Sequence, residues 1–222
     1  MSKHLSDKRI IECWHKNASP WTKAVRGGEI PSRKLLTNQA IIDAVLALRP
    51  TTALDLGCGE GWLSRTLAQH GILTLGVDAV KDLTDAARLY DDKPNGTSPS
   101  YTSQPQQRPS YKCLSYEQII DGALEKKFDV LVCNFSLLGK ESVEGIFSTF
   151  SRLLSHQGHV VIQTPHPLSH ANENNHCGWR RGSWAGFSDE FSHPAPWYFR
   201  TMENWRSLFH TNQLTLVKEI SL

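Results

Sequence analysis

Hydrophobic residues along this chain form two kinds of pattern, short apolar runs and longer stretches with a helical period. The run at 128–135 is nearly continuous, which is typical of a central parallel strand buried on both faces. Further short runs predict strands at 52–56, 73–78, 111–114, 159–164 and 214–220. Helical spacing predicts helices at 36–48, 60–69, 80–90, 141–154 and 202–211, with Thr37 as the N-cap of the first. Strands and helices that alternate at these lengths predict a doubly wound, mostly parallel α/β sheet flanked by helices.

Three stretches depart from this alternation. Residues 91–110 are rich in Ser, Pro and Gln, so we expect a mobile loop away from the ligand edge of the sheet, with partner binding as the alternative. Residues 165–200 follow the carboxyl end of a strand and are rich in Trp and His, so we expect an aromatic lid over a substrate pocket. Residues 1–35 form a basic segment in which 17–21 are expected to break any helix and Gly27-Gly28 to form a turn.

Composition narrows the class of protein only slightly. The 222 residues hold 24 Lys or Arg and 22 Asp or Glu, a net charge of +2 that makes no strong case for nucleic acid. The five cysteines are scattered without a C-x-x-C pair, so we expect neither a disulfide framework nor a zinc site, but reduced cytoplasmic thiols. No apolar run is long enough to span a membrane, and the first residues lack the apolar core of a signal peptide.

The candidate chemistry centres on a glycine-rich turn between the strand at 52–56 and the helix that follows. Its glycines are Gly57, Gly59 and Gly61, whereas the dinucleotide pattern G-x-G-x-x-G needs a glycine where Trp62 stands. The Gly-Lys-Ser/Thr of a phosphate-binding loop is absent too. Asp55 precedes the first glycine by two, and a carboxylate there would repel a pyrophosphate and suit a cationic amine. A chance glycine turn in an unrelated α/β protein is the alternative.

The stretch Asp55-Leu-Gly-Cys-Gly-Glu-Gly61 resembles motif I of the class I S-adenosylmethionine-dependent methyltransferases. The resemblance implies a Rossmann-like fold, S-adenosyl-L-methionine as cofactor, S-adenosyl-L-homocysteine as product, and an acidic residue that holds the ribose at the end of the second strand. Asp78 stands there, 21 residues after Gly57. The implied cofactor residues are Asp55, Gly57, Cys58, Gly59, Asp78, Ala79, Ser115, Tyr116 and Asn134.

Three of these positions carry particular expectations. The family brackets the adenine with residues after the third strand, here Ser115 and Tyr116, although Ser115 also fits a helix N-cap. Asn134 would face the transferring methyl, but the N/D-P-P-Y pattern of amino-methylating enzymes and the Pro-Cys pair of cytosine enzymes are absent. Cys133 is then expected to be a buried core thiol.

The segment before motif I often covers the cofactor in this family. The resemblance therefore suggests that Arg26 or Arg33 reaches the cofactor carboxylate or an anionic substrate, with Trp21 packed over the site. The alternative is a solvated basic arm with two tryptophans tucked into the core.

The expected lid supplies the remaining candidates. Its substrate-facing residues would be Trp179, Arg180, Trp184, Trp197 and Tyr198. His166, nearest the strand end, is the candidate general base, and a structural histidine is the alternative. A metal site built from His166, His170, His176, Cys177 and His193 is not expected, because their spacing fits no zinc pattern.

The predicted function is transfer of the methyl group to a small-molecule acceptor by direct in-line displacement, in a domain spanning 36–222. The alternatives are an RNA or protein methyltransferase that uses the basic segment, a non-catalytic cofactor-binding module and, more distantly, an NAD-dependent enzyme. The family adds a seventh strand between the fifth and sixth that is missing here, so we expect a truncated chain.

Overall fold

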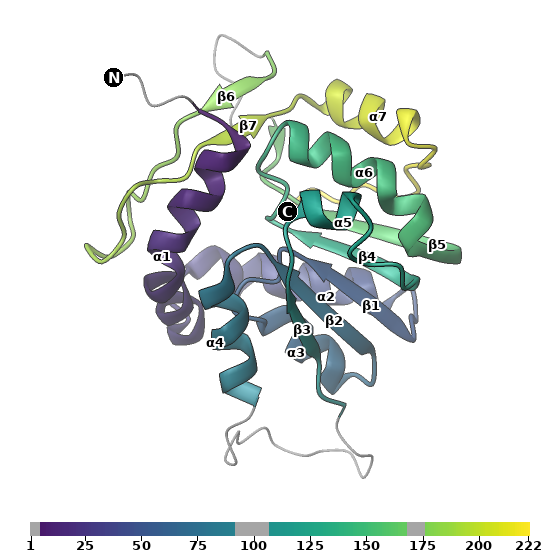
Figure 1. Cartoon of the computed structure of the whole chain (residues 1–222), viewed down its shortest axis with the longest axis horizontal. Coiled ribbons are helices and arrows are strands. Elements are labelled where there is room, and N and C mark those ends of the chain that lie inside the picture. Colours follow the sequence, from purple (N-terminus) through teal and green to yellow (C-terminus); the bar gives the residue numbers. More distant parts are fainter. Residues whose placement is uncertain (1–4, 92–106, 168–175) are drawn as a thin grey trace.

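The computed structural model describes residues 5–91, 107–167 and 176–222. His170 and positions 92–106 of the loop expected at 91–110 therefore lie outside the described residues, while Asp91 ends a helix and Ser110 begins a strand. Its centre is a five-stranded parallel sheet with the order β3-β2-β1-β4-β5 (Figure 1). The strands are β1 (Thr52–Leu56), β2 (Leu73–Asp78), β3 (Ser110–Cys113), β4 (Phe128–Asn134) and β5 (Leu154–Gln163). This confirms the predicted parallel α/β class and brings the carboxyl ends of all five strands to one edge.

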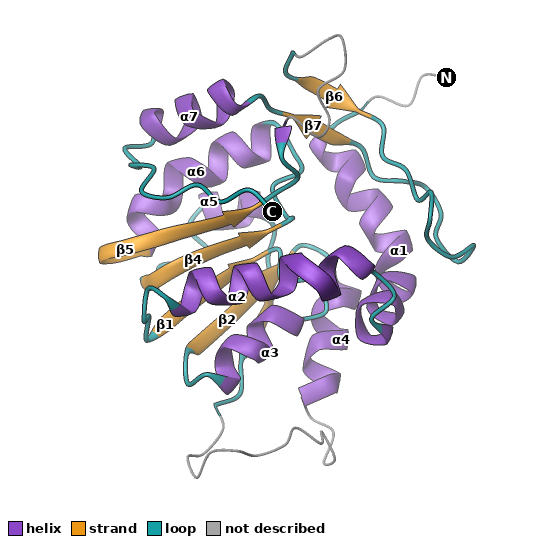
Figure 2. Ribbon diagram, turned by 180° about the vertical axis from the view of Figure 1, so that it is seen from behind, coloured by secondary structure: helices purple, strands orange, loops and turns teal. Residues whose placement is uncertain are grey.

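Helices cover both faces of the sheet, because the central strands present apolar residues to both sides. Val130 and Val132 of β4 pack with α2 (Asn38–Leu46) and α3 (Trp62–Gln69), which lie in front of the sheet in Figure 2. Leu131 and Cys133 face the opposite cluster, which confirms Cys133 as a core thiol. That face is covered by α5 (Tyr116–Ile120), α6 (Glu141–Leu153) and α7 (Met202–Thr211), while α4 (Lys81–Asp91) packs on β2 and β3.

The N-terminal segment is one continuous helix, α1 (Asp7–Gly27), and the predicted break at 17–21 is wrong. Pro20 lies inside it, where the missing N–H and the ring are expected to cost about 3 kcal/mol. Burial of Ala18, Pro20 and Ala24 offsets that cost. The predicted turn is correct, since Gly28 ends the helix in a left-handed conformation.

The predicted start of the next helix is also wrong. Thr37 makes no capping bond, because it ends a π-helical turn, η1 (Arg33–Thr37), that runs directly into α2. A π turn closes on i→i+5 hydrogen bonds and so widens the helix locally, and such turns are frequent at functional sites.

The expected lid contains a short antiparallel pair, β6 (Gly178–Arg180) and β7 (Trp197–Phe199), that the sequence did not reveal. Together α1 and residues 176–200 lie over the carboxyl edge of the sheet, and we call them the cap (Figure 1). The strand predicted at 214–220 does not form. Leu216, Val217 and Ile220 are exposed there, so this segment has no buried face that would hold it in the sheet.

Candidate functional site

The glycine turn after β1 follows a path that L-residues rarely adopt. Gly57, Gly59 and Gly61 all have positive φ, of 76°, 58° and 83°. A Cβ on Gly57 would lie 2.3 Å from Cβ of Ser136, so β1 and the segment after β4 could not approach as closely with alanine there. A Cβ on Gly59 would meet only Nε1 of Trp21, at 3.7 Å. Gly59 therefore leaves free space beneath the cap for a ligand.

Two acidic side chains, the buried Asp55 and the partly buried Asp78, adjoin this turn. Asp55 is 1% exposed and accepts a hydrogen bond of 2.7 Å from Oγ of Ser64, and burial raises its pKa to about 7. Asp78 accepts from the backbone N–H groups of Gly59 and Val80, at 2.9 and 2.8 Å. Burial raises the pKa of Asp78 as well, and these two bonds oppose that rise. Both backbone bonds fix the Asp78 carboxylate at the carboxyl end of β2.

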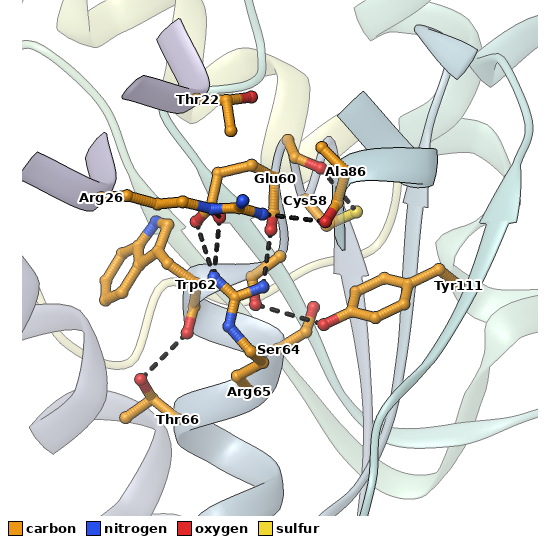
Figure 3. Close-up of polar contacts among 12 residues, drawn as sticks. Thr22, Arg26, Cys58, Glu60, Trp62, Ser64, Arg65, Thr66, Ala86 and Tyr111 are labelled. Atoms are coloured by element: carbon orange, nitrogen blue, oxygen red, sulfur yellow. Dashed lines mark hydrogen bonds and ion pairs between the residues drawn. The ribbon is translucent and has the colours of Figure 1, made fainter. Parts of the chain in front are cut away.

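Glu60 joins the turn to the cap. It is 1% exposed and binds Nε of Arg26 at 2.7 Å and Nη2 of Arg65 at 2.7 Å (Figure 3). Arg26 also donates to the carbonyl of Ala86 at 2.8 Å, and both guanidinium groups lie over the ring of Tyr90. Arg26 is thus held by the protein's own carboxylate and is not among the residues that line the cavity.

A cavity of about 820 Å³ lies between the cap and the carboxyl edge of the sheet. It brings together most of the site residues that the sequence predicted. Those that line it are Trp21, Arg33, Asp55, Gly57, Cys58, Gly59, Asp78, Ala79, Tyr116, Asn134, Arg180, Trp184, Trp197 and Tyr198. Arg26, Ser115, His166 and Trp179 are not in the lining.

Arg33 is the arginine that faces this cavity. Its guanidinium lies 4.8 Å from the ring centroid of Trp62 and 5.6 Å from that of Trp21, and Nε donates to Asn38. Its Nη2 is buried without a hydrogen-bond partner, and burial lowers the pKa of Arg33 to about 10. A buried, unpaired donor on a cation can be satisfied by an anionic ligand group.

Aromatic rings close the cavity from the cap side. Trp14 meets Trp21 and Trp184 edge to face, with centroids 5.1 and 5.8 Å apart, and Phe187 packs against Trp184 at 5.2 Å. The buried Asn17 of α1 links to Ser192 by two hydrogen bonds of 2.6 and 2.9 Å. These contacts hold α1 and the 176–200 segment together as one wall.

The cap also binds the segment between β4 and α6. Arg200, 2% exposed, donates to the carbonyls of Gly139 and Lys140 at 2.8 and 3.0 Å. From the start of α1, Asp7 accepts from the backbone N–H groups of Lys140 and Ser142 and so caps α6 from a distance. Sequence reasoning missed both residues, because their partners are main-chain groups that no local motif marks.

The two residues predicted to border the adenine, Ser115 and Tyr116, differ in whether they line the cavity. Ser115 is the N-cap of α5, in a capping box with Gln118, which confirms that expectation. Tyr116 turns toward the cavity, and its hydroxyl lies 3.4 Å from the carbonyls of Leu56 and Ser136. Tyr111, absent from the predictions, packs its ring beside Gly61 on the other side of the turn, and its hydroxyl donates to the Gly61 carbonyl at 3.3 Å.

The described residues contain no group of three His, Cys, Asp or Glu side chains that could hold a metal ion. No helix in the described ranges is long and apolar enough to cross a bilayer.

Comparison with known proteins finds a family and several relatives. The methyltransferase domain family matches residues 33–219. The ubiquinone biosynthesis O-methyltransferase of Coxiella burnetii is 32% identical over 92 residues, 41% of this chain and 34% of that protein. The enzyme of that name from Dechloromonas aromatica is 25% identical over 123 residues, 55% of this chain and 48% of that protein. The chain thus matches less than half the length of these curated relatives.

Solved structures agree in fold. An S-adenosylmethionine-dependent methyltransferase from Clostridium acetobutylicum superposes with a TM-score of 0.62 at 17% identity, covering 93% of this chain and 89% of that one. The magnesium protoporphyrin IX methyltransferase of Synechocystis PCC 6803, solved with bound cofactor, gives 0.59 at 17% identity, with 98% and 91% covered. Because the family match covers most of the sequence, the chain belongs to the methyltransferase domain family and has the fold of the S-adenosylmethionine-dependent enzymes.

Proposed function

We propose that this S-adenosylmethionine-dependent methyltransferase moves the methyl group to a small-molecule acceptor by direct in-line transfer. One observation carries the proposal. A partly buried carboxylate, a left-handed glycine turn and an unpaired guanidinium nitrogen line the same capped cavity, in the residues Asp78, Gly57–Gly61 and Arg33. The carboxylate complements the ribose hydroxyls of the cofactor, and the guanidinium complements its carboxylate. The glycine turn lets the cofactor approach the backbone closely.

The cofactor would lie across the strand ends in a fixed order. Asp78, oriented by two backbone N–H groups, would accept hydrogen bonds from the ribose hydroxyls. Arg33 would pair with the carboxylate of the amino acid end, and Asp55 would favour its ammonium group. Tyr116 would border the adenine.

The bound cofactor supplies an electrophilic methyl on a sulfonium, which becomes a neutral thioether on transfer. The chain's part is to align the two reactants and exclude water. The cap rings Trp21, Trp184 and Phe187 provide an apolar wall, which does not oppose a reaction in which the sulfonium loses its charge.

A small acceptor is favoured because two cations of the basic N-terminal segment form ion pairs within the protein. Arg26 is paired with Glu60, and Lys23 of α1 is paired with Glu190 of the cap. These two cations hold the cap to itself and to the glycine turn, which leaves the exposed Lys8, Lys16 and Lys34 of this segment for any contact with RNA phosphates. The names of the curated relatives, which describe an O-methyltransferase of ubiquinone biosynthesis, also agree with a small acceptor. His166 remains the candidate base from sequence, although Pro165 and not His166 lines the cavity.

Calorimetric titration tests the proposal. Wild type and Asp78→Asn are titrated with S-adenosylmethionine, S-adenosylhomocysteine and NAD, with Asp82→Asn as the control, since Asp82 is an exposed acid four residues further on. We expect both cofactor forms to bind wild type and the control, at least about tenfold weaker binding to Asp78→Asn, and no binding of NAD. Binding of NAD, or equal affinities in both variants, would contradict the proposed site.

A further inference from the structure

Thr37, at the end of η1, has a buried hydroxyl without a hydrogen-bond partner among the described residues. A helical threonine can donate its hydroxyl to the carbonyl four residues earlier. Thr22 and Thr66 do so in this protein, with oxygen–oxygen distances of 2.8 and 2.9 Å (Thr66 in Figure 3). At Thr37 the carbonyl four residues earlier is that of Arg33, and it accepts the backbone N–H of Asn38 in the π turn. The hydroxyl of Thr37 is therefore available to a ligand.

Thr37 shares one side of its helix with Arg33, whose Nη2 is also buried and without a partner among the described residues. The two residues are four apart, and side chains at this spacing are neighbours on a helix surface. Ile41, four residues further on in α2, belongs to the same apolar cluster as Leu63 of α3. The common side therefore faces α3, the helix into which the glycine turn leads. Both Arg33 and Thr37 line the cavity.

Contacts of Arg33 place this pair beside the glycine turn. Its guanidinium lies 4.8 Å from the ring centroid of Trp62, the first residue after the turn. It lies 5.6 Å from the ring centroid of Trp21, whose Nε1 is the atom nearest to the open side of Gly59. Unpaired buried polar groups are rare in native proteins, because each one gives up water without gaining a partner. Two of them on one helix face beside this turn indicate that a ligand held by the turn supplies the acceptors.

We propose that Thr37 and Arg33 form a two-donor clamp on the carboxylate at the amino acid end of the cofactor. The hydroxyl of Thr37 donates to one carboxylate oxygen and Nη2 of Arg33 donates to the other. The inference rests on the proposed function and adds Thr37 to its cofactor site. A carboxylate suits the pair because it offers two acceptor oxygens and a negative charge, whereas an ammonium group here would meet the positive guanidinium. The clamp should therefore recognise the amino acid end of a ligand and not its nucleoside.

Two thioethers with the same nucleoside test the clamp, S-adenosylhomocysteine with the amino acid end and methylthioadenosine without it. Their affinities are measured by calorimetry for wild type, Thr37→Val and Thr37→Ser. Thr66→Val is the matched control, since Thr66 lies outside the cavity lining and its hydroxyl is bonded within α3. We expect S-adenosylhomocysteine to bind Thr37→Val about tenfold more weakly than wild type, because valine has the same shape without the donor. Thr37→Ser should retain its affinity, and methylthioadenosine should bind all four proteins equally.

Unchanged affinity of Thr37→Val for S-adenosylhomocysteine would overturn the clamp. An equal loss of both ligands would overturn it too, because methylthioadenosine has no carboxylate to lose. Wild type that binds neither ligand would instead refute the proposed function itself. The melting temperature of the ligand-free proteins gives a second readout. We expect Thr37→Val to melt at or above the wild-type temperature and Thr66→Val, which loses a hydrogen bond, to melt below it. A lower melting temperature for Thr37→Val would mean that the protein itself satisfies this hydroxyl, which removes the basis of the clamp.

Discussion

Replacement of Asp55 by asparagine should make the ligand-free protein more stable at neutral pH. Asp55 is 1% exposed, and burial raises its pKa from 3.8 to about 7. Asparagine keeps an oxygen that can accept the hydroxyl hydrogen of Ser64, and it carries no charge to desolvate. The substitution therefore resembles the protonated aspartic acid that the buried site favours.

The sign and size of the effect follow from proton binding. Between pH 4 and 7 the folded protein retains a proton on Asp55 that the unfolded chain has lost, so the free energy of unfolding falls as pH rises through this window. At about 1.4 kcal/mol per pH unit, the whole window amounts to about 4 kcal/mol. We expect Asp55→Asn to exceed wild type by up to about this amount at pH 8, and by little near pH 4.

Urea unfolding at pH 5, 6, 7 and 8, followed by tryptophan fluorescence, measures this difference. Asp121→Asn is the control, because Asp121 is exposed at the end of α5. A wild-type unfolding free energy that does not change across this range would refute the reasoning, as would an Asp55→Asn protein that is less stable at pH 8. The same variant should bind S-adenosylmethionine more weakly, since the charge that destabilises the fold is the one proposed to favour the ammonium group.

Three further substitutions test the contacts that hold the site together. Glu60→Gln removes the carboxylate charge that the partly exposed guanidinium groups of Arg26 and Arg65 share and should lower the free energy of unfolding by about 1–3 kcal/mol in urea, with the exposed Glu125→Gln as the control. Gly57→Ala should cost at least about 1 kcal/mol more than Gly28→Ala, because both glycines have positive φ but only Gly57 has a neighbour, at 2.3 Å, in the way. Arg200→Met strips two main-chain carbonyls of their donor and should lower the unfolding free energy by about 3 kcal/mol, and a loss under about 1 kcal/mol would argue against a structural role.

The strand ends were predictable from sequence because the signals that define them are local. Apolar runs end at Asp55-Leu56, Asp78 and Asn134, and the glycines that follow the first run need no distant partner to adopt positive φ. Since a parallel sheet brings all carboxyl ends to one edge, the grouping of these residues followed from the alternation of strands and helices.

The cap was only partly predictable, because it depends on contacts between distant segments. Pro20 signals a helix end, and only its burial in a long amphipathic helix overrides that signal. The β6–β7 pair joins residues nearly twenty apart along the chain, with no short turn to mark it. The sequence also left Arg26 and Arg33 equivalent, and the distinction arises because Glu60 engages the first and leaves the second facing the cavity.

Whether a buried polar atom has a hydrogen-bond partner distinguishes residues that hold the fold together from candidate ligand-binding residues better than residue type does. The buried polar atoms of Glu60, Asn17 and Arg200 all have partners, and each of these residues joins the cap to the sheet or to itself. In contrast, the buried atoms without a hydrogen-bond partner include those of Arg33, Thr37, Asn134 and Gln163, which come from η1 and the ends of β4 and β5. Each would cost about 1–3 kcal/mol if left unpaired. Arg33, Thr37 and Asn134 also line the cavity, so this edge is complementary to a polar ligand, which supports the proposed pairing of Arg33 with an anionic group of the cofactor.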